Sequence, residues 1–144
     1  MISLALAREL KEAGLVWKAG IHDFFTIPDR DMDDRVFVVT DVMAYLEIFR
    51  GWPVVTFHGT AEWALDYILT TEVVWMPTEG QLRQELENIL TGEVEPGLQL
   101  IREQDGDYTC EIYYQGQELR FAAPTAGESY ALALLYAFRH YPPP

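Results

Sequence analysis

Hydrophobic and polar positions follow two different periods along this chain, and the periods predict its elements. Apolar residues recur at helical spacing in residues 3–13, 61–69, 79–91 and 126–140. Runs rich in β-branched and aromatic residues predict strands at residues 36–39, 42–49, 53–57, 73–75, 98–104, 107–115 and 118–122. The order is helix, three strands, helix, strand, helix, three strands, helix, which is typical of an α+β protein.

Turn and capping residues mark the ends of these elements. Thr78 with Gln81, and Thr125 with Glu128, have the spacing of a capping box at a helix start. Thr60 is an expected N-cap for the helix over residues 61–69. The dipeptide at 105–106 is Asp-Gly, which suits the two-residue type I′ turn of a β-hairpin.

We therefore predict an α+β fold with a mostly antiparallel meander sheet and about four capped helices packed against it. No linker of low complexity divides the chain, so residues 1–144 are expected to form a single domain with a short proline tail at 141–144. Residues 57–65 weakly echo residues 121–132, and shared capping rules are sufficient to explain that echo.

Net charge changes the set of expected partners. The formal charge is −13, and residues 1–72 carry 6 basic and 12 acidic side chains, so the acidity is not confined to a tail. A field of this sign repels phosphate backbones and anionic lipid surfaces, so neither a nucleic-acid nor a membrane partner is expected. Mimicry of a nucleic acid is an alternative that requires the carboxylates to gather on one face.

The compartment expected from the sequence is the cytoplasm. Cys110 is the only cysteine, so no intramolecular disulfide can form. The first residues lack the basic leader of a signal peptide. The longest apolar run, residues 130–138, is shorter than the roughly 20 residues that span a bilayer.

Alternating carboxylates give a weak indication of a metal site. Asp29, Asp31 and Asp33 begin like a calcium-binding loop. The sixth position should be glycine and is Asp34, and the twelfth should be glutamate and is Thr40. A solvated loop is the favoured interpretation, and no metal or cofactor is expected.

Catalytic motifs are sparse, which favours a protein that is not an enzyme. His58 lies just before the expected helix at 61–69, with Glu62 one turn on, and this pair is the best general-base candidate. A capping or packing role for His58 competes with it. The sequence contains no Gly-x-Ser-x-Gly elbow and no phosphate-binding glycine loop. Cys110 lies in an alternating strand and is interpreted as a small core residue.

Tryptophan at strand ends is the strongest indication of a binding surface. Trp75 and Met76 lie at the end of the short strand expected at residues 73–75, and Trp52 lies at a turn. Anchoring of the core is the competing interpretation for these residues. An exposed tryptophan would be a natural hot spot for a protein partner.

Several short strings carry a resemblance to a known family: Gly14–Trp17, Phe25–Asp29, Val36–Val39, Gly59–Leu65, Trp75–Pro77 with Gln81–Leu82, and Ala123–Thr125. Over nearly its whole length the chain resembles a family of small bacterial proteins, mostly described as uncharacterised and sometimes labelled pilus-assembly proteins. The ATPase that usually has that label carries a P-loop lysine, and this chain has none. Residues 98–138 are also similar to phage-type α/β sandwich domains, which implies a compact αβ packing.

The leading hypothesis is a non-enzymatic protein-interaction or regulatory module of the bacterial cytoplasm, with an exposed apolar patch that binds a protein partner or a second copy in a homodimer. The alternative is a small-molecule-binding protein or minor hydrolase with a cleft near His58 and Glu62.

Overall fold

The chain divides into two compact units in the computed structural model, which describes residues 1–28, 35–40, 44–57 and 67–140. Unit 1 comprises Met1–Leu15 and Pro77–Pro144, and unit 2 comprises Val16–Met76. The single domain expected from the sequence stays a prediction.

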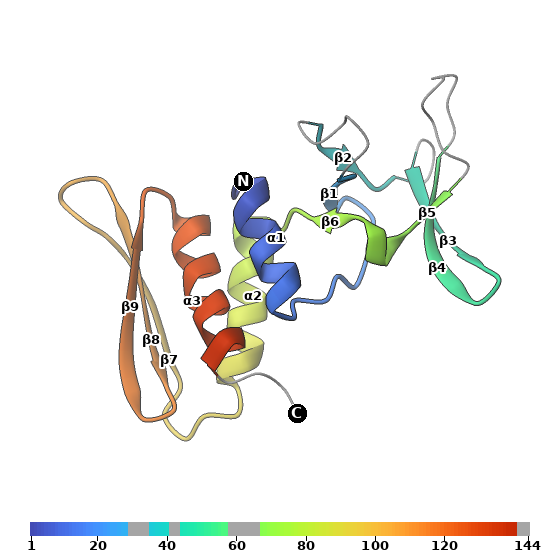
Figure 1. Ribbon diagram of the computed structural model, residues 1–144. Coiled ribbons are helices and arrows are strands. Elements are labelled where there is room, and N and C mark those ends of the chain that lie inside the picture. The colour runs from blue at the N-terminus through green and yellow to red at the C-terminus, as the bar shows by residue number, and fades with distance from the viewer. Residues whose placement is uncertain (29–34, 41–43, 58–66, 141–144) are drawn as a thin grey trace. The chain divides into compact units, whose positions relative to one another are not determined.

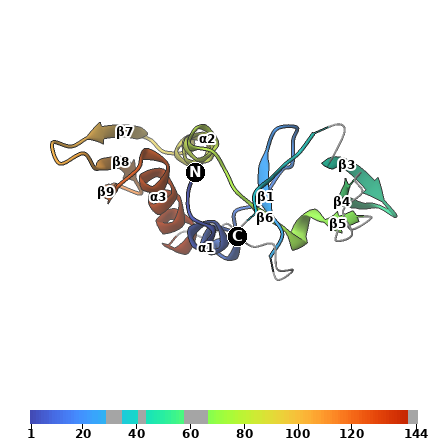
Figure 2. The ribbon, with the colours of Figure 1, turned by 90° about the horizontal axis from the view of Figure 1, so that it is seen from above.

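Unit 1 is built in layers on one antiparallel sheet. The sheet has the order β7-β8-β9, with β7 at Gly97–Arg102, β8 at Tyr108–Tyr114 and β9 at Gln117–Ala123. Helix α3 (Ala126–His140) packs against β8 and β9. Helices α1 (Leu4–Ala13) and α2 (Glu79–Leu90) pack against α3 (Figures 1 and 2). The central helix α3 therefore has protein on more than one side, as its apolar sequence predicts.

Small side chains make this central position of α3 possible. Ala131, Ala133 and Ala137 are buried together with Leu134, so neighbouring backbones can approach the helix closely. Ser129 is the polar exception, and its hydroxyl donates to the carbonyl of Ala126 at 2.7 Å. That bond satisfies a polar group that would be costly to bury alone.

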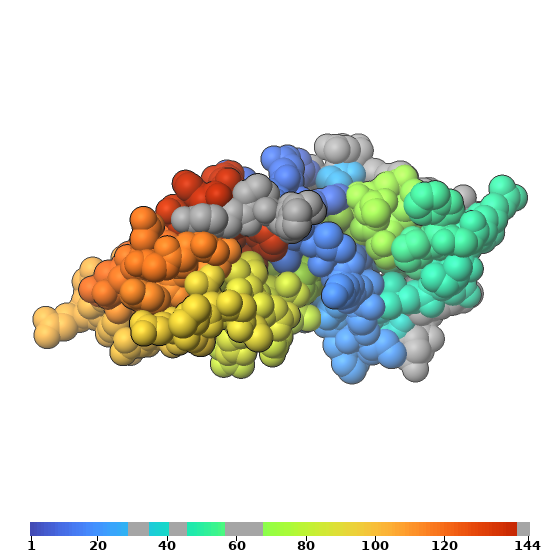
Figure 3. All heavy atoms as spheres, turned by 90° about the horizontal axis from the view of Figure 1, so that it is seen from below, coloured from blue at the N-terminus to red at the C-terminus, as the bar shows by residue number. Residues whose placement is uncertain are grey.

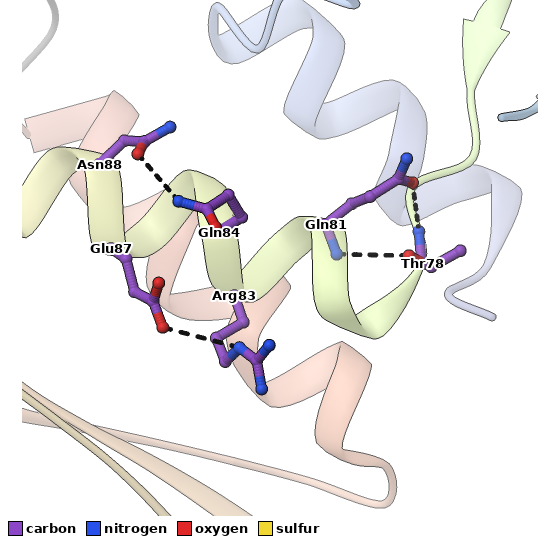
Figure 4. A network of polar contacts seen from close by, with 6 residues as sticks. All are labelled: Thr78, Gln81, Arg83, Gln84, Glu87 and Asn88. Atoms are coloured by element: carbon purple, nitrogen blue, oxygen red, sulfur yellow. Dashed lines mark hydrogen bonds and ion pairs between the residues drawn. The ribbon is translucent and has the colours of Figure 1, made fainter. Parts of the chain in front are cut away.

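The predicted capping box of α2 is confirmed. The Gln81 N–H donates to Thr78 Oγ1 at 3.2 Å, and the Thr78 N–H donates to Gln81 Oε1 at 3.0 Å (Figure 4). Two backbone donors that the first turn leaves without helical partners are thus satisfied. Leu82, Leu86 and Leu90 then form the buried stripe of this helix.

Replacing Thr78 with alanine should lower the free energy of unfolding by about 1 kcal/mol, because the Gln81 N–H loses its acceptor. Gln84→Ala is the control, since among the described residues the Gln84 side chain bonds Asn88 alone, on the exposed side of the same helix (Figure 4). That change should stay within about 0.5 kcal/mol. Urea titration of both variants measures the difference, and equal midpoints would contradict the prediction.

Unit 2 contains two further antiparallel sheets. One has the order β2-β1-β6, with β1 at Phe24–Thr26, β2 at Phe37–Val38 and β6 at Val74–Trp75. The other has the order β3-β4-β5, with β3 at Ala44–Phe49, β4 at Trp52–Phe57 and β5 at Tyr67–Leu69, followed by the 3₁₀ turn η1 at Thr70–Glu72. Their shared core contains Phe25, Ile27, Val39, Val55, Ile68 and Val73.

The α+β class and the antiparallel pairing are confirmed, but the arrangement differs from the prediction. The described strands form three sheets of three strands and not one meander, and the described residues contain three α-helices and not four. Of the expected helix at 61–69, residues 61–66 lie outside the described residues, and 67–69 form β5. Ile68 pairs with Val55 in the core, and so short an apolar run suits a strand as well as a helix.

The type I′ turn predicted at residues 105–106 is wrong. Only Gly106 has a positive φ there, and its N–H donates to the Glu103 carbonyl, as in a longer loop that ends in a bulge. Two other turns have positive φ at both central residues, namely Arg50-Gly51 between β3 and β4 and Gln115-Gly116 between β8 and β9. Glycine in the second position relieves the strain of this conformation.

Candidate functional site

The β3–β4 hairpin of unit 2 is the candidate site, and its alternating register sets which side chains share a face. Leu46 pairs with Val55, and Ile48 pairs with Pro53. Paired residues of antiparallel strands point to the same side, and so do residues two apart along a strand. These four residues therefore line one face of the hairpin.

Along this face, the pair Leu46–Val55 belongs to the core, while the next pair toward the turn, Ile48–Pro53, lies on the surface. Val55 is fully buried in the core of unit 2, and Leu46 packs partly against it. Ile48, one pair nearer to the turn, is 72% exposed, and Pro53 is exposed beside it. The apolar stripe that anchors the hairpin thus continues beyond the core into solvent.

Trp17 contributes to a wall beside this stripe. Its indole N–H donates to Asp23 Oδ2 at 2.9 Å, and the Gly20 N–H donates to the same oxygen at 2.9 Å. Asp23 is buried, so the two bonds hold the loop between these residues in one conformation. The Trp17 ring lies 5.6 Å from the Phe25 ring, which stacks in turn on Phe37. The wall is therefore supported by the aromatic part of the core.

A hollow of about 490 Å³ lies between the wall and the hairpin. It is lined by Trp17, Lys18, Ala19, Leu46, Glu47, Ile48, Pro53, Val54 and Thr70. Its surface is mainly apolar, and Lys18, Glu47 and Thr70 are the polar residues named in its lining. This arrangement suits an apolar side chain or short segment with a polar group nearby.

The opposite face of the hairpin is also apolar near the turn. Phe49 pairs with Trp52, and these side chains are 40% and 63% exposed. The Arg50 guanidinium lies over the Phe49 ring at 5.2 Å from its centroid. Figure 3 shows the teal surface of this hairpin exposed on unit 2. The hairpin end thus presents apolar side chains on both faces.

Exposed apolar residues are concentrated in unit 2. Ten large hydrophobic side chains are exposed among the described residues, and seven belong to unit 2: Val16, Ile21, Val36, Val38, Ile48, Phe49 and Trp52. Three of the seven lie at the hairpin end. Scattered apolar residues are ordinary on a protein surface, but a cluster next to a hollow indicates a binding surface.

The predicted binding residues occupy different environments. Trp52 is at the hairpin end, where its ring is open to solvent. Trp75 is half-buried in β6, and its Nε1 atom is buried without a hydrogen-bond partner in the described part of the chain. Met76 is buried. Of these three, Trp52 has the exposure that a hot spot needs.

The predicted catalytic and metal candidates lie outside the described residues. These are His58 and Glu62 for general-base chemistry, and Asp29, Asp31 and Asp33 for a cation. Within the described ranges, no group of three or more His, Cys, Asp and Glu side chains is placed to hold a metal ion.

A pair of carboxyl groups forms a second polar cluster, on the sheet of unit 1. The two groups belong to Glu111 and Glu118. The hydrogen bond between them raises the pKa of Glu111, and desolvation and the charge of Glu118 raise it further, while the charge of Arg120 lowers it. A hollow of about 400 Å³ lined by Gln99, Tyr113 and both glutamates lies there. Glu118 is exposed and Glu111 is half-buried, so water competes at Glu118 for any ligand that the pair would hold.

Sequence reasoning missed Ile48 as a surface residue and Trp17 as the wall of a hollow. The signal for Ile48 was present in the strand itself. Residues 44–49 read Ala-Tyr-Leu-Glu-Ile-Phe, which places apolar side chains on both faces and not on one. The role of Trp17 depends on Asp23 and on strands from far along the chain, so no local pattern could reveal it.

No family model, curated protein or solved structure matches this chain. Among the described residues, no helix is both long and apolar enough to cross a membrane.

Proposed function

We propose that this protein is an interaction module that binds a protein partner through the β3–β4 hairpin. The observation that carries the proposal is the exposure of Trp52 beside Phe49, with Ile48 and Pro53 exposed on the other face of the same hairpin. Tryptophan is among the residues most enriched at interface hot spots, because one side chain removes a large apolar area from water.

The free energy available from this surface is substantial. An aromatic side chain buries about 150–250 Å², so the exposed fraction of Trp52 offers on the order of 100–150 Å². At about 25 cal/mol per Å², covering that area is worth roughly 3 kcal/mol before the costs of association. Ile48 and Phe49 add to it. A surface of this kind supports recognition of an apolar patch on another protein.

Charge also favours this region of the molecule. Between residues 44 and 57 the charged residues are Glu47 and Arg50, which cancel, in a chain of net charge −13. The Glu47 carboxylate accepts a hydrogen bond from the Thr56 hydroxyl at 2.9 Å, so its charge is partly satisfied within the hairpin. A partner can approach here without the like-charge repulsion that an acidic protein meets elsewhere.

Photo-crosslinking in the cells that encode the protein tests the proposal. A photoreactive phenylalanine analogue replaces Trp52 and, in a second variant, Val94, which is an exposed apolar residue in unit 1. We expect discrete protein adducts from position 52 and none above background from position 94.

Loss of the adduct in an Ile48→Asp background would support the proposal further, because Ile48 lies at the same hairpin end. Equal adduct patterns from positions 52 and 94, or no adduct from position 52, would contradict it.

A second candidate function is binding of a small molecule in the hollow beside Trp17. Its volume of about 490 Å³ lies within the range of roughly 300–1,000 Å³ typical of ligand sites. A ligand that raises the melting temperature of the protein but not of a Trp17→Ala variant would favour this function over a protein partner.

A further inference from the structure

We propose that the partner of the hairpin is a second copy of this chain, bound through the open edge of β3. The two β3 strands pair antiparallel about a two-fold axis, with Leu46 opposite Leu46 of the partner copy. This inference rests on the proposed function and specifies it, since it names both the occupant and the register.

The hairpin register shows which backbone groups of β3 are available. In a hairpin with a two-residue turn, the residues that flank the turn form a hydrogen-bonded pair, here Phe49 and Trp52. Bonded pairs then alternate along the strand, so Ala44, Leu46 and Ile48 point their N–H and C=O groups away from β4. Within the described residues β3 pairs only with β4. This edge is a template for another strand.

The sequence of β3 suits such pairing and lacks the usual protection against it. Natural edge strands are often blunted by lysine, proline or a bulge. The six residues of β3 contain none of these, and their pairing with β4 is continuous from Ala44 to Phe49. The single charge in the strand is Glu47, whose carboxylate is bound to Thr56.

Symmetry and charge select one register. A two-fold axis perpendicular to the sheet places some residue of β3 opposite itself. Centring on Glu47 would place two carboxylates directly opposite each other, which destabilises an antiparallel pair. An axis that passes at Leu46 avoids this repulsion between carboxylates. It pairs Ala44 with Ile48 of the partner copy, so the outward N–H and C=O groups of Ala44, Leu46 and Ile48 are all bonded. About six backbone hydrogen bonds would form.

The size of this contact predicts a weak dimer. Pairing covers one strand edge and the exposed part of Ile48, which amounts to a few hundred Å² per copy, against the roughly 800 Å² of a standard stable interface. We therefore expect a concentration-dependent dimer with a dissociation constant on the order of micromolar. The hairpin is nearly neutral, but each copy carries a net charge of −13, so the two copies repel each other through charges outside the contact. Salt screens this long-range repulsion, so added salt should lower the dissociation constant of the dimer.

Cysteine cross-linking tests the register. Leu46→Cys should form a disulfide-linked species of twice 16.5 kDa under mild oxidation, because opposed residues of a bonded pair have Cα atoms about 5.5 Å apart. Glu47→Cys is the matched control. Its two copies would be diagonal neighbours at about 7–8 Å, which is too far for a disulfide. The parent chain, whose only cysteine is the buried Cys110, should stay monomeric on the denaturing gel.

Light scattering over a concentration series gives a second test that does not need a new cysteine. Ile48→Pro removes an N–H that points to the open edge and leaves the bonds to β4 in place. It should abolish the rise in mass with concentration. Ile48→Ala keeps the N–H and should weaken the dimer by about tenfold or less. Circular dichroism of both variants checks that the hairpin unit is folded.

The outcomes separate this inference from the proposed function. A monomer at all concentrations, or efficient cross-linking of Glu47→Cys in place of Leu46→Cys, would overturn the paired β3 edges. If the adducts from position 52 then contain a different protein, the interaction module stands and only the identity of its partner changes. If photo-crosslinking at position 52 and disulfide cross-linking at position 46 both give no adduct, the interaction module and the paired β3 edges are both overturned.

Discussion

Replacing Phe25 with alanine is expected to lower the free energy of unfolding of unit 2 by about 3–5 kcal/mol. Phe25 is fully buried, and its ring is in contact with Trp17 and Phe37 at centroid distances of 5.6 Å. The loss combines the transfer free energy of the ring with the cavity that remains.

Tryptophan fluorescence measures this effect selectively, because Trp17, Trp52, Trp63 and Trp75 all belong to unit 2. Trp52→Ala is the matched control. It removes an even larger aromatic side chain, but one that is 63% exposed, so the cost should be below about 1 kcal/mol. A larger cost for Trp52→Ala than for Phe25→Ala would contradict the assignment of Phe25 to the core and of Trp52 to the binding surface.

The thiol of Cys110 is expected to react with Ellman's reagent on the order of 10³-fold more slowly in the folded protein than in the unfolded chain at pH 8. Burial raises the pKa of Cys110 from 9.0 to about 12, so the folded protein holds far less of the thiolate that reacts. Steric exclusion of the reagent slows the reaction further, since the side chain is inaccessible. Reaction at the unfolded rate would show that the sheet of unit 1 opens readily.

The same pKa difference sets a dependence of stability on pH. The unfolded thiol ionises near pH 9, while the folded thiol keeps its proton until about pH 12. The stabilising contribution of the neutral thiol is therefore complete below pH 9 and is lost progressively as the pH rises from 9 toward 12. Cys110→Ala should flatten the curve of unfolding free energy against pH in this window. Identical curves for both proteins would refute the raised pKa.

Local signals in the sequence identified most of the elements of unit 1. The capping box at Thr78 and Gln81 and the leucine stripe that follows it are set by residues within one helix, and both are found in the structure. The strands around Cys110 follow from period-two alternation, and its burial follows from its place in that pattern. These features depend on neighbours a few residues apart, so a sequence pattern contains them.

Unit 2 was less predictable because its strands are short and its core is assembled from distant segments. Residues 67–69 have an apolar run compatible with a helix, and only pairing of Ile68 with Val55 makes them a strand. One local signal in unit 1 was also misleading: the Asp-Gly pair predicted a type I′ turn, but the hydrogen bond of the Gly106 N–H to the Glu103 carbonyl belongs to a longer loop. A turn preference worth a fraction of a kcal/mol yields to the register that the flanking strands adopt.

The sequence by itself determined the α+β class, the helix boundaries of unit 1, the low reactivity expected of Cys110 and the near-neutral charge of residues 44–57. Only the tertiary structure decided that Trp52 is exposed while Phe25 is buried, that Asp23 holds Trp17 as the wall of a hollow, and that β3 has an open edge. The physical reason is that burial and edge position depend on which strands pair across the chain. Hydrophobicity along the sequence is the same for an anchoring and an exposed tryptophan.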